Sequence, residues 1–328
     1  MTFEELWDNQ LLPELQVLEN ERKKLFRQYI LPMTLTGIGT VITGAIGYFR
    51  LENGVPFAQN IMLILAIILG ITLVTLFIKS SKPLSLYKEK FKNNIVSVIV
   101  KSLNENLNYS PYGGITQQEF KRSRLFLTKP DRYKSEDFVE GVIDKTKIKF
   151  SEVHAEYKTE HRDSKGNKRT EWHDIFKGIF FIADFNKPFK TKTIVLPDTA
   201  EKMFGSYLGS LFQKANISRK EELVKLENPV FEKEFVVYGD DQIESRYILT
   251  PDLMEKILEL KTSFRKELHI SFISNNVHIA IPYKDLFEPS YYKSIIDKST
   301  ILEYYQVLSR LINIVELLNL NTRIWGKG

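Results

Sequence analysis

The chain has 328 residues, of which 43% are hydrophobic, with 46 basic and 41 acidic side chains and no cysteine. This composition allows one or two globular domains, and it excludes a disordered, collagenous or disulfide-stapled chain. The absence of cysteine also excludes a thiol nucleophile, a cysteine-bound zinc ion and an iron–sulfur cluster.

Two long uncharged stretches follow an N-terminal segment, residues 1–27, which we expect to be helical and cytoplasmic. We expect residues 28–49 to form a first transmembrane helix, 50–58 a short external loop and 59–78 a second transmembrane helix. About 20 helical residues cross a hydrocarbon core of roughly 30 Å, so both stretches are long enough. The alternative is a pair of buried helices in a large soluble core, which would normally carry more polar residues.

Small side chains recur along the first stretch, where Thr36, Thr40 and Gly44 follow one another at four-residue steps. On a helix these residues share one face, and small residues let another helix approach closely. We expect that other helix to be the second span. A homo-oligomeric pore also stays open, although charged residues, which usually mark a transport route, are absent from both stretches.

Basic side chains flank the two stretches and predict their orientation. The connecting loop holds only Arg50 as a basic residue. Because cytoplasmic flanks carry the excess of Lys and Arg, we expect a multi-pass protein of the cell (inner) membrane with both termini and the large domain cytoplasmic. A signal peptide is disfavoured, since several acidic residues precede the first stretch. The flanking cations are Arg22, Lys23, Lys24 and Arg27 before the first stretch, and Lys79, Lys82, Lys88, Lys90 and Lys92 after the second.

Residues 79–130 are expected to form a basic, membrane-proximal helical segment. Six lysines and two acids between positions 79 and 108 supply +4 of the formal net charge of +5. Apolar residues from Leu84 to Leu107 recur at helical spacing, which predicts an amphipathic helix leaving the membrane. Lysines at this place attract anionic headgroups, so the charge indicates the lipid bilayer as a partner, and we expect no nucleic-acid binding.

Residues 131–328 are expected to form an α+β cytoplasmic domain with a mixed or antiparallel sheet, preceded by the two-helix transmembrane hairpin. Strands and helices are mixed there without strict alternation, which is typical of that class. The expected strands are Phe138–Ile143, Ile148–Thr159, Thr170–Phe185, Thr193–Leu196, Phe231–Tyr238, His269–Ser274 and Val277–Pro282. Helices are expected to begin near Thr116, Ala200, Asp241, Thr250 and Thr300, several of them at capping residues.

The second and third of these strands form an expected hairpin with its turn at Asp163-Ser164-Lys165-Gly166. In that register the numbers of facing residues sum to 329. One face then pairs Glu160 with Arg169, Lys158 with Glu171, Glu156 with His173 and Glu152 with Lys177, while the other pairs Tyr157 with Trp172 and Val153 with Phe176. Opposite charges on one face and apolar side chains on the other favour this register.

Several phrases between Phe150 and Trp325 resemble the domain-of-unknown-function 3137 family of bacterial proteins. They include Ser151-Glu152-Val153-His154-Ala155-Glu156-Tyr157, Ile175-Phe176-Lys177-Gly178, Ala183-Asp184-Phe185, Leu226-Glu227-Asn228-Pro229, Phe231-Glu232-Lys233, the run from Asp241 to Pro251 and the ending Asn319-Leu320-Asn321-Thr322-Arg323-Ile324-Trp325. The resemblance implies two hydrophobic helices ahead of the conserved part. It implies no activity and no catalytic residues.

One group of side chains could carry chemistry. Glu152, His154 and Glu156 alternate on one strand and so project to the same face, and His173 is expected beside Glu156. Two carboxylates and two imidazoles within reach of each other could bind a divalent metal or transfer protons. The alternative is the cross-strand charge ladder, in which Glu156 and Glu152 simply face His173 and Lys177.

Three further polar groups are interpreted structurally. Asp240, Asp241, Glu244 and Arg246 are expected to cap a helix and pair locally, although a ligand or cation site is the alternative. The hairpin tip carries Lys158, Arg162, Lys165, Lys168 and Arg169 with Glu160 and Asp163, a net charge of +3. His269 and His278 lie in expected strands and are expected to be structural.

The sequence contains no phosphate-binding, dinucleotide-binding, serine-hydrolase or zinc-protease signature. We therefore assign no catalytic, cofactor-binding or metal residue, expect no cofactor and favour a non-enzymatic membrane protein. Its cytoplasmic domain would be a binding or scaffold module for a protein partner, another copy of the chain or the membrane surface. The alternative is a membrane-associated enzyme that uses the Glu/His strand face, and a nucleic-acid-binding hairpin is the third hypothesis.

Overall fold

The computed structural model describes residues 2–57, 60–162, 168–185, 189–198 and 221–320. The chain divides into two compact units, which are described separately below. The first, the helical unit, consists of Met1–Val98 with Glu288–Ile301. The second, the sheet unit, consists of Ile99–Phe287 with Leu302–Gly328.

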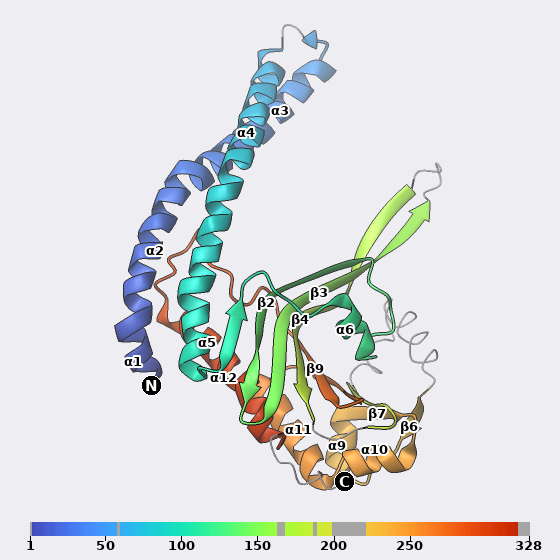
Figure 1. Ribbon diagram of the computed structural model, residues 1–328. Helices are drawn as coiled ribbons and strands as arrows, with labels where there is room; N and C mark the ends of the chain where they lie inside the picture. The colour runs from blue at the N-terminus through green and yellow to red at the C-terminus, as the bar shows by residue number, and fades with distance from the viewer. Residues whose placement is uncertain (1, 58–59, 163–167, 186–188, 199–220, 321–328) are drawn as a thin grey trace. The chain divides into compact units, whose positions relative to one another are not determined.

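Two long helical rods build the helical unit (Figure 1). The first consists of α1 (Phe3–Leu6), the π-helical η1 (Trp7–Leu11), α2 (Leu12–Leu25), the π-helical η2 (Phe26–Ile30) and α3 (Leu31–Glu52). The second consists of α4 (Ile61–Phe91), the π-helical η4 (Lys92–Val96) and α5 (Ser97–Leu103), which extends into the sheet unit. Thr2 opens the first rod with a capping box that includes Glu5, so the first free amide groups have partners.

The two rods meet closely along α3 and α4. The side chain of Thr40 lies 4.0 Å from the place where a Cβ on Gly70 would stand, and a Cβ on Gly44 would lie 3.9 Å from that of Ala66. At Gly47 a Cβ would lie 2.7 Å from Leu63 Cγ, so only glycine fits there without a shift. The expectation that small residues of the first stretch face the second is confirmed.

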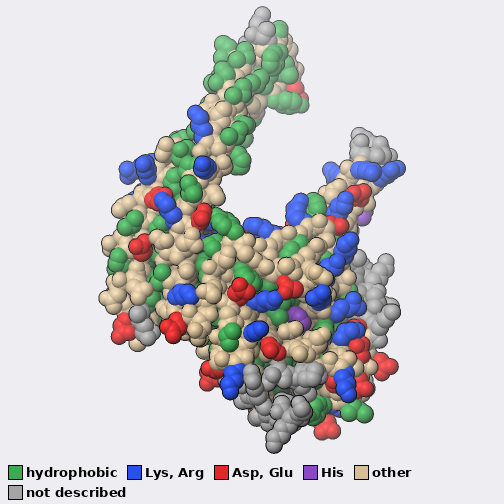
Figure 2. All heavy atoms as spheres, viewed as in Figure 1, with side chains coloured by type: hydrophobic (Ala, Val, Ile, Leu, Met, Phe, Trp, Pro, Cys, Tyr) green, Lys and Arg blue, Asp and Glu red, His purple; other side chains and the backbone are tan. Residues whose placement is uncertain are grey.

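Both rods contain a helical stretch that is long and apolar enough to cross a membrane, within residues 3–52 and 61–103. None of the most apolar window of the second rod is buried, and Figure 2 shows hydrophobic side chains over much of the α3–α4 hairpin. Ile71 on α4 is 61% exposed and Val41 on α3 is 72% exposed. The molecule thus has two candidate membrane-spanning helices.

The segment 288–301, far along the chain, packs into the helical unit through buried charges. Arg22 Nη2 lies 2.7 Å from Glu19 Oε1, and its Nη1 donates to the carbonyl of Tyr291 over 2.9 Å. The amide of Ile295 donates to the other oxygen of Glu19 over 3.1 Å. Hydrogen bonds from Arg22 hold the pKa of Glu19 below its usual value despite burial. Glu19 therefore neutralises the charge of Arg22.

The sheet unit contains nine strands within the described residues, in the order β1-β2-β3-β4-β9-β8-β5-β7-β6, and every neighbouring pair is antiparallel. With its helices this confirms the expected α+β class after a helical hairpin. The strands are β1 (Leu107–Ser110), β2 (Arg132–Ile143), β3 (Thr146–Arg162), β4 (Lys168–Asp184), β5 (Thr193–Pro197), β6 (Glu222–Val224), β7 (Phe235–Gly239), β8 (His269–Ile273) and β9 (Asn276–Pro282).

Capping residues set most helix starts of the sheet unit. Thr116 caps α6 (Gln117–Arg122) with Glu119, and Thr250 caps α11 (Pro251–Phe264), as the sequence predicts. The remaining helices are α9 (Pro229–Glu234), α10 (Gln242–Ile248) and α12 (Lys298–Leu317).

Three expected elements need comment. The strand expected over Phe231–Tyr238 is wrong at its start, because the side chain of Asn228 accepts from two amides and Pro229 opens α9, so the strand begins only at Phe235. The expected amphipathic helix ends at Leu103, and β1 follows as a strand that the sequence analysis missed. The helix expected from Ala200 to Ala215 lies outside the described residues.

The register expected for the β3–β4 hairpin is wrong. Facing residues sum to 330 from Arg162 opposite Lys168 to Glu156 opposite Asp174, and to 331 from Ala155 opposite Phe176 onward. The connection therefore holds residues 163–167, one more than the expected turn, which itself lies outside the described residues. Ile175 is an extra residue, and such a β-bulge changes the facing pairs along a strand.

The core of the sheet unit decides this register. Ala155, Phe176 and Phe180 lie in one buried cluster with Phe120 of α6. Ile175 is buried in the same cluster, so two consecutive residues of β4 face the core, which an unbulged strand cannot achieve. Val153 and Phe176 are core residues as expected, but Trp172 is 40% exposed and is not.

Candidate functional site

The bulge at Ile175 divides the β3–β4 hairpin into a base and an arm. We call residues 146–155 with 175–184 the base, and residues 156–162 with 168–174 the arm. At the base, a Cβ on Gly178 would clash with the carbonyl oxygen of Ile281 on β9, since the two strands approach closely there. On the arm most side chains are exposed, and the two strands extend past the rest of the sheet (Figure 1). The polar residues singled out in the sequence lie near the boundary.

Three side chains at this boundary could hold a metal ion. One ligand atom each of His154, Glu156 and Asp174 lies within 4.8 Å of the others. His154 Nε2 lies 2.7 Å from Asp174 Oδ1. Glu156 faces Asp174 across the strands, and its side chain is 13% exposed against 62% for Asp174. One imidazole and two carboxylates suit a divalent transition metal that completes its shell with water.

The structure brings together only part of the expected group Glu152, His154, Glu156 and His173. His154 and Glu156 are neighbours, but Asp174 stands where His173 was expected. His173 instead faces Tyr157, its ring 5.0 Å from the tyrosine ring, and its Nε2 lies 2.8 Å from Thr159 Oγ1. The one-residue change of register moves His173 to the other face of the strand.

Glu152 has a different environment from His154 and Glu156. Its Oε2 accepts from the amide of Leu286 over 3.2 Å. Burial raises the pKa of the Glu152 carboxyl to about 7, and the nearby charge of Asp137 acts in the same direction. Lys177, expected opposite Glu152, lies instead 2.8 Å from Asp285. Glu152 is therefore a partly buried acid, separate from the three-residue cluster.

The expected cross-strand charge ladder is also wrong. Lys158 pairs with Glu160 of its own strand over 3.0 Å, and Lys134 on β2 pairs with Glu136 over 2.6 Å. These two pairs run along a strand and not across the hairpin, and exposed pairs of this kind contribute little to stability.

Arg132 of β2 joins the boundary cluster to an exposed aromatic side chain. Its Nη1 lies 3.2 Å from Glu156 Oε2, and its guanidinium carbon lies 3.8 Å from the centroid of the Trp172 ring. Arg132, Glu156 and Asp174 face one another across three strands. We call Arg132, His154, Glu156, Trp172 and Asp174 the arm face. Trp and Arg stacked on a partly exposed surface are typical of protein-binding sites.

The arm beyond this face is positively charged. Arg162, Lys168 and Arg169 are exposed and lie next to one another in the facing strands, and Figure 2 shows Lys and Arg side chains along the arm. The acidic side chains Glu160 and Glu171 are nearby, so the surplus is modest. The phenylalanines of β4, by contrast, are in the core, and Phe180 and Phe181 are fully buried.

The second polar group is held by local contacts. Asp241 accepts from the Glu244 amide over 2.7 Å, which confirms it as a cap. Glu244 is not part of that cap, because its carboxylate accepts from the Lys190 and Thr191 amides and from the Thr191 hydroxyl. Those bonds hold the pKa of Glu244 below its usual value. Arg246 donates to the Lys225 carbonyl and Asp240 pairs with Lys192. These contacts hold residues 190–192 and Lys225 against α10 and Asp240.

The two histidines of the β8–β9 hairpin differ in their contacts. His278 is 5% exposed and its Nδ1 lies 3.4 Å from the Ser271 hydroxyl. Burial lowers the pKa of His278 to about 4, so the ring is neutral near pH 7. The His269 ring packs 5.4 Å from that of Phe126. His278 therefore acts as a core residue, as expected.

Sequence signals for the missed residues exist but are local. Ile175-Phe176 places two apolar residues in succession within an alternating strand, which indicates a bulge. That bulge changes the pairs only from Ala155 onward, and Asp174 faces Glu156 because the connection 163–167 is one residue longer than the expected turn. Arg132 lies before the first expected strand, and no pattern in the sequence places it beside Trp172.

In comparisons with known proteins, the chain matches a family model and is weakly similar to a solved structure. Residues 174–320 match the family described as "Protein of unknown function (DUF3137)", which confirms the resemblance. No curated protein matches the chain. The crystal structure of the mycobacterial trehalose monomycolate transport factor A, TtfA, is similar with 8% identity and a TM-score of 0.34, over 70% of this chain and 95% of that chain. The family description assigns no activity.

Proposed function

We propose that this protein is a membrane-anchored binding module that holds a protein partner on its arm face. The observation that carries the proposal is the stacked pair Arg132 and Trp172 beside Glu156, at the foot of an exposed arm whose far end carries Arg162, Lys168 and Arg169. The argument has two parts, the anchor and the binding surface.

The anchor is supported by the exposed apolar side chains of α3 and α4. Each such side chain removed from water contributes on the order of 25 cal/mol per Å² of apolar surface, so a lipid environment is strongly favoured. We assign residues 28–49 and 59–78 to the membrane, with 50–58 as the external loop and residues 1–27, 79–130 and 131–328 on the cytoplasmic side of the inner membrane. The excess of Lys and Arg on the flanks supports this orientation.

The chain provides a direct test of that orientation because it contains no cysteine. Single cysteines introduced at Glu52 and at Glu171 would react with a membrane-impermeant maleimide only from the side on which each lies. We expect labelling of the Glu52→Cys protein in intact cells and of the Glu171→Cys protein only after the membrane is opened. Labelling of Glu171→Cys in intact cells would contradict a cytoplasmic domain.

The binding surface is supported by the chemistry of the arm. Trp and Arg carry a large share of the binding energy in protein interfaces, since they bury large areas and make directed polar contacts. The exposed Arg162, Lys168 and Arg169 extend the surface with positive charge. A partner segment that offers an aromatic or apolar contact to Trp172 and carboxylates to these cations would complement it.

Site-specific photo-crosslinking of the full chain in its membrane tests this proposal. A photoreactive residue at Trp172 or at the facing Lys158 should give one recurring crosslinked protein, and Arg132→Ala together with Lys168→Ala should reduce that product at Lys158 at least fivefold. The matched control is the same photoreactive residue at Ile243, which is 79% exposed on another part of the sheet unit. No product from the arm, or the same product from position 243, would overturn the proposal.

A second candidate function is metal-dependent activity, which the cluster His154, Glu156 and Asp174 favours. A metal held there could activate a bound water molecule, with Arg132 beside it to hold an anionic substrate group. Elemental analysis of the purified full chain, wild type against His154→Asn with Glu156→Gln, tests it. One equivalent of zinc or manganese that is absent from the variant would support this function, and metal-free wild-type protein after exposure to either ion would exclude it.

A further inference from the structure

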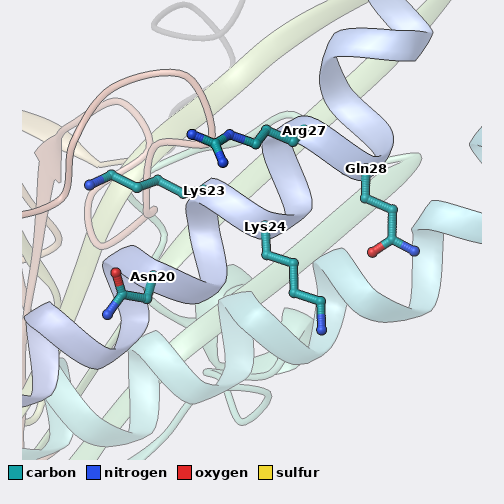
Figure 3. Close-up of a pocket in the computed structure, with 5 residues that line it drawn as sticks. All are labelled: Asn20, Lys23, Lys24, Arg27 and Gln28. Atoms are coloured by element: carbon teal, nitrogen blue, oxygen red, sulfur yellow. The ribbon is translucent and has the colours of Figure 1, made fainter.

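A hollow on the first helical rod is lined entirely by polar side chains. Asn20, Lys23 and Lys24 come from α2, and Arg27 and Gln28 come from η2 (Figure 3). We call it the basic hollow. It is open and shallow, with a volume of about 520 Å³, within the range of about 300–1,000 Å³ that small-ligand sites occupy.

The side chains around the basic hollow form two rows. Lys23 and Arg27 extend in one direction, and Lys24 and Gln28 extend in another (Figure 3). Residues four apart share a helix face, so each row follows from the spacing in the sequence. The π-helical turn η2 begins at Phe26, and such turns occur often at functional sites because they change which side chains meet.

The charge of the hollow is only partly neutralised by the protein. Arg22, the neighbouring cation, is paired with Glu19 and buried, but Lys24 and Arg27 have no ion-pair partner within the part of the chain that the structure describes. Lys23 Nζ lies 3.8 Å from Glu19 Oε1, and the Lys23 side chain is 57% exposed. No acidic side chain lines the hollow. Lys24 and Arg27 thus lie within one turn of the same helical rod without an ion-pair partner in the described residues, beside the amides of Asn20 and Gln28.

The position of the hollow in the sequence relates it to the bilayer. α3 begins at Leu31, four residues after Arg27, and about 6 Å of helix separates them. If α3 enters the membrane, as proposed above, the hollow lies at the level of the lipid headgroups. Basic pockets at this level bind phosphate-bearing headgroups, and a guanidinium can contact two phosphate oxygens at once.

We infer that the basic hollow binds the phosphate of an anionic glycerophospholipid headgroup, with Arg27 and Lys24 as its main contacts. Arg27 donates to two phosphate oxygens, the two lysines provide point charges, and the amide groups of Asn20 and Gln28 donate to the remaining ester or glycerol oxygens. This inference rests on the proposed membrane anchor.

Native mass spectrometry of the full chain in detergent, titrated with phosphatidylglycerol or phosphatidylcholine, tests the inference. We expect one phosphatidylglycerol molecule to be retained in at least tenfold preference to phosphatidylcholine. Lys24→Gln with Arg27→Gln should lose at least nine-tenths of that retention. The matched control, Lys79→Gln with Lys82→Gln on α4, removes the same charge at the expected flank of the other span and should keep it.

Three results would overturn the inference. Equal loss in both double variants would mean a general electrostatic attraction, unchanged retention in Lys24→Gln with Arg27→Gln would place the lipid elsewhere, and displacement of phosphatidylglycerol by millimolar inorganic phosphate would identify a site for the free anion. Membrane fractionation of the same proteins separates this inference from the proposed function. A chain that is absent from the membrane fraction contradicts the anchor, whereas a chain that is present but retains no lipid contradicts only the basic hollow.

Discussion

The base and the arm of the β3–β4 hairpin belong to the same two strands but have opposite environments. At the base, Ala155, Phe176 and Phe180 are buried in one cluster. On the arm, Lys158 and Trp172 face each other and are exposed. The single extra residue Ile175 separates the two regions. Strand propensity alone therefore does not divide core from surface here, and the packing against α6 does.

The largest expected effect of a single substitution is at the base. Phe180→Ala should lower the free energy of unfolding by about 3–5 kcal/mol, because it removes a fully buried ring that packs 5.2 Å from Phe120 and leaves a cavity. Denaturant unfolding of the full chain in detergent, followed by tryptophan fluorescence, would measure it. A loss below about 1 kcal/mol would mean that the base is not the core.

A second test of the base uses pH. The pKa of His278 is lowered to about 4 in the folded chain, against 6.5 for a free ring, so between pH 6.5 and 4 the unfolded state binds a proton that the folded state does not. Stability should therefore fall as pH decreases through this window, by about 3 kcal/mol from this residue. His278→Gln should show a correspondingly flatter decrease in unfolding free energy from pH 7 to pH 4. An unchanged slope would contradict the burial of a neutral ring.

Glu152, near the boundary, should respond to pH in the opposite direction. Its folded pKa of about 7 exceeds the ordinary 4.5, so the folded state retains a proton between these values and stability falls as pH rises from 4.5 to 7. Glu152→Gln, whose amide oxygen can still accept from Leu286, should raise the unfolding free energy by about 1–3 kcal/mol at pH 8 and leave it nearly unchanged at pH 5. Destabilisation at pH 8 would instead mean that a charged carboxylate is required.

The smallest expected effect on stability is on the arm. Trp172→Ala should change the free energy of unfolding by less than about 0.5 kcal/mol, since the ring is partly exposed and contacts chiefly Arg132. Thermal unfolding beside Phe180→Ala would measure the difference between the two regions directly. If Trp172→Ala were as destabilising as Phe180→Ala, the arm would be a part of the core and not a binding surface.

Local sequence signals predicted individual helices and hairpins more reliably than the contacts between strands. The Thr250-Pro251 start of α11, the Thr116 capping box and the β8–β9 hairpin were predicted because a few neighbouring residues determine them. The Asn228 cap is equally local, and the strand expected from Phe231 was wrong because that signal was not used.

The candidate site was predicted only in part. His154 and Glu156 follow from strand alternation, which needs no partner strand. Asp174 and Arg132 depend on the register of β4 and β2 against β3, and the length of the connection 163–167 sets the first of these along the arm. Charge complementarity favoured a different register. That prediction was wrong because exposed ion pairs contribute too little free energy to oppose the burial of apolar side chains.

The sequence by itself determined the two apolar helices, the α+β class and the basic flank that lines the hollow, since each depends on composition or on spacing within one helix or strand. Only the tertiary structure decided that the segment 288–301 completes the helical unit, that Glu19 neutralises Arg22 but not Arg27, and that Trp172 lies beside Arg132. These contacts join residues far apart in the chain or select among near neighbours. They arise because burial of the core fixes the backbone first, and the polar side chains then pair with whatever groups the core has brought close to them.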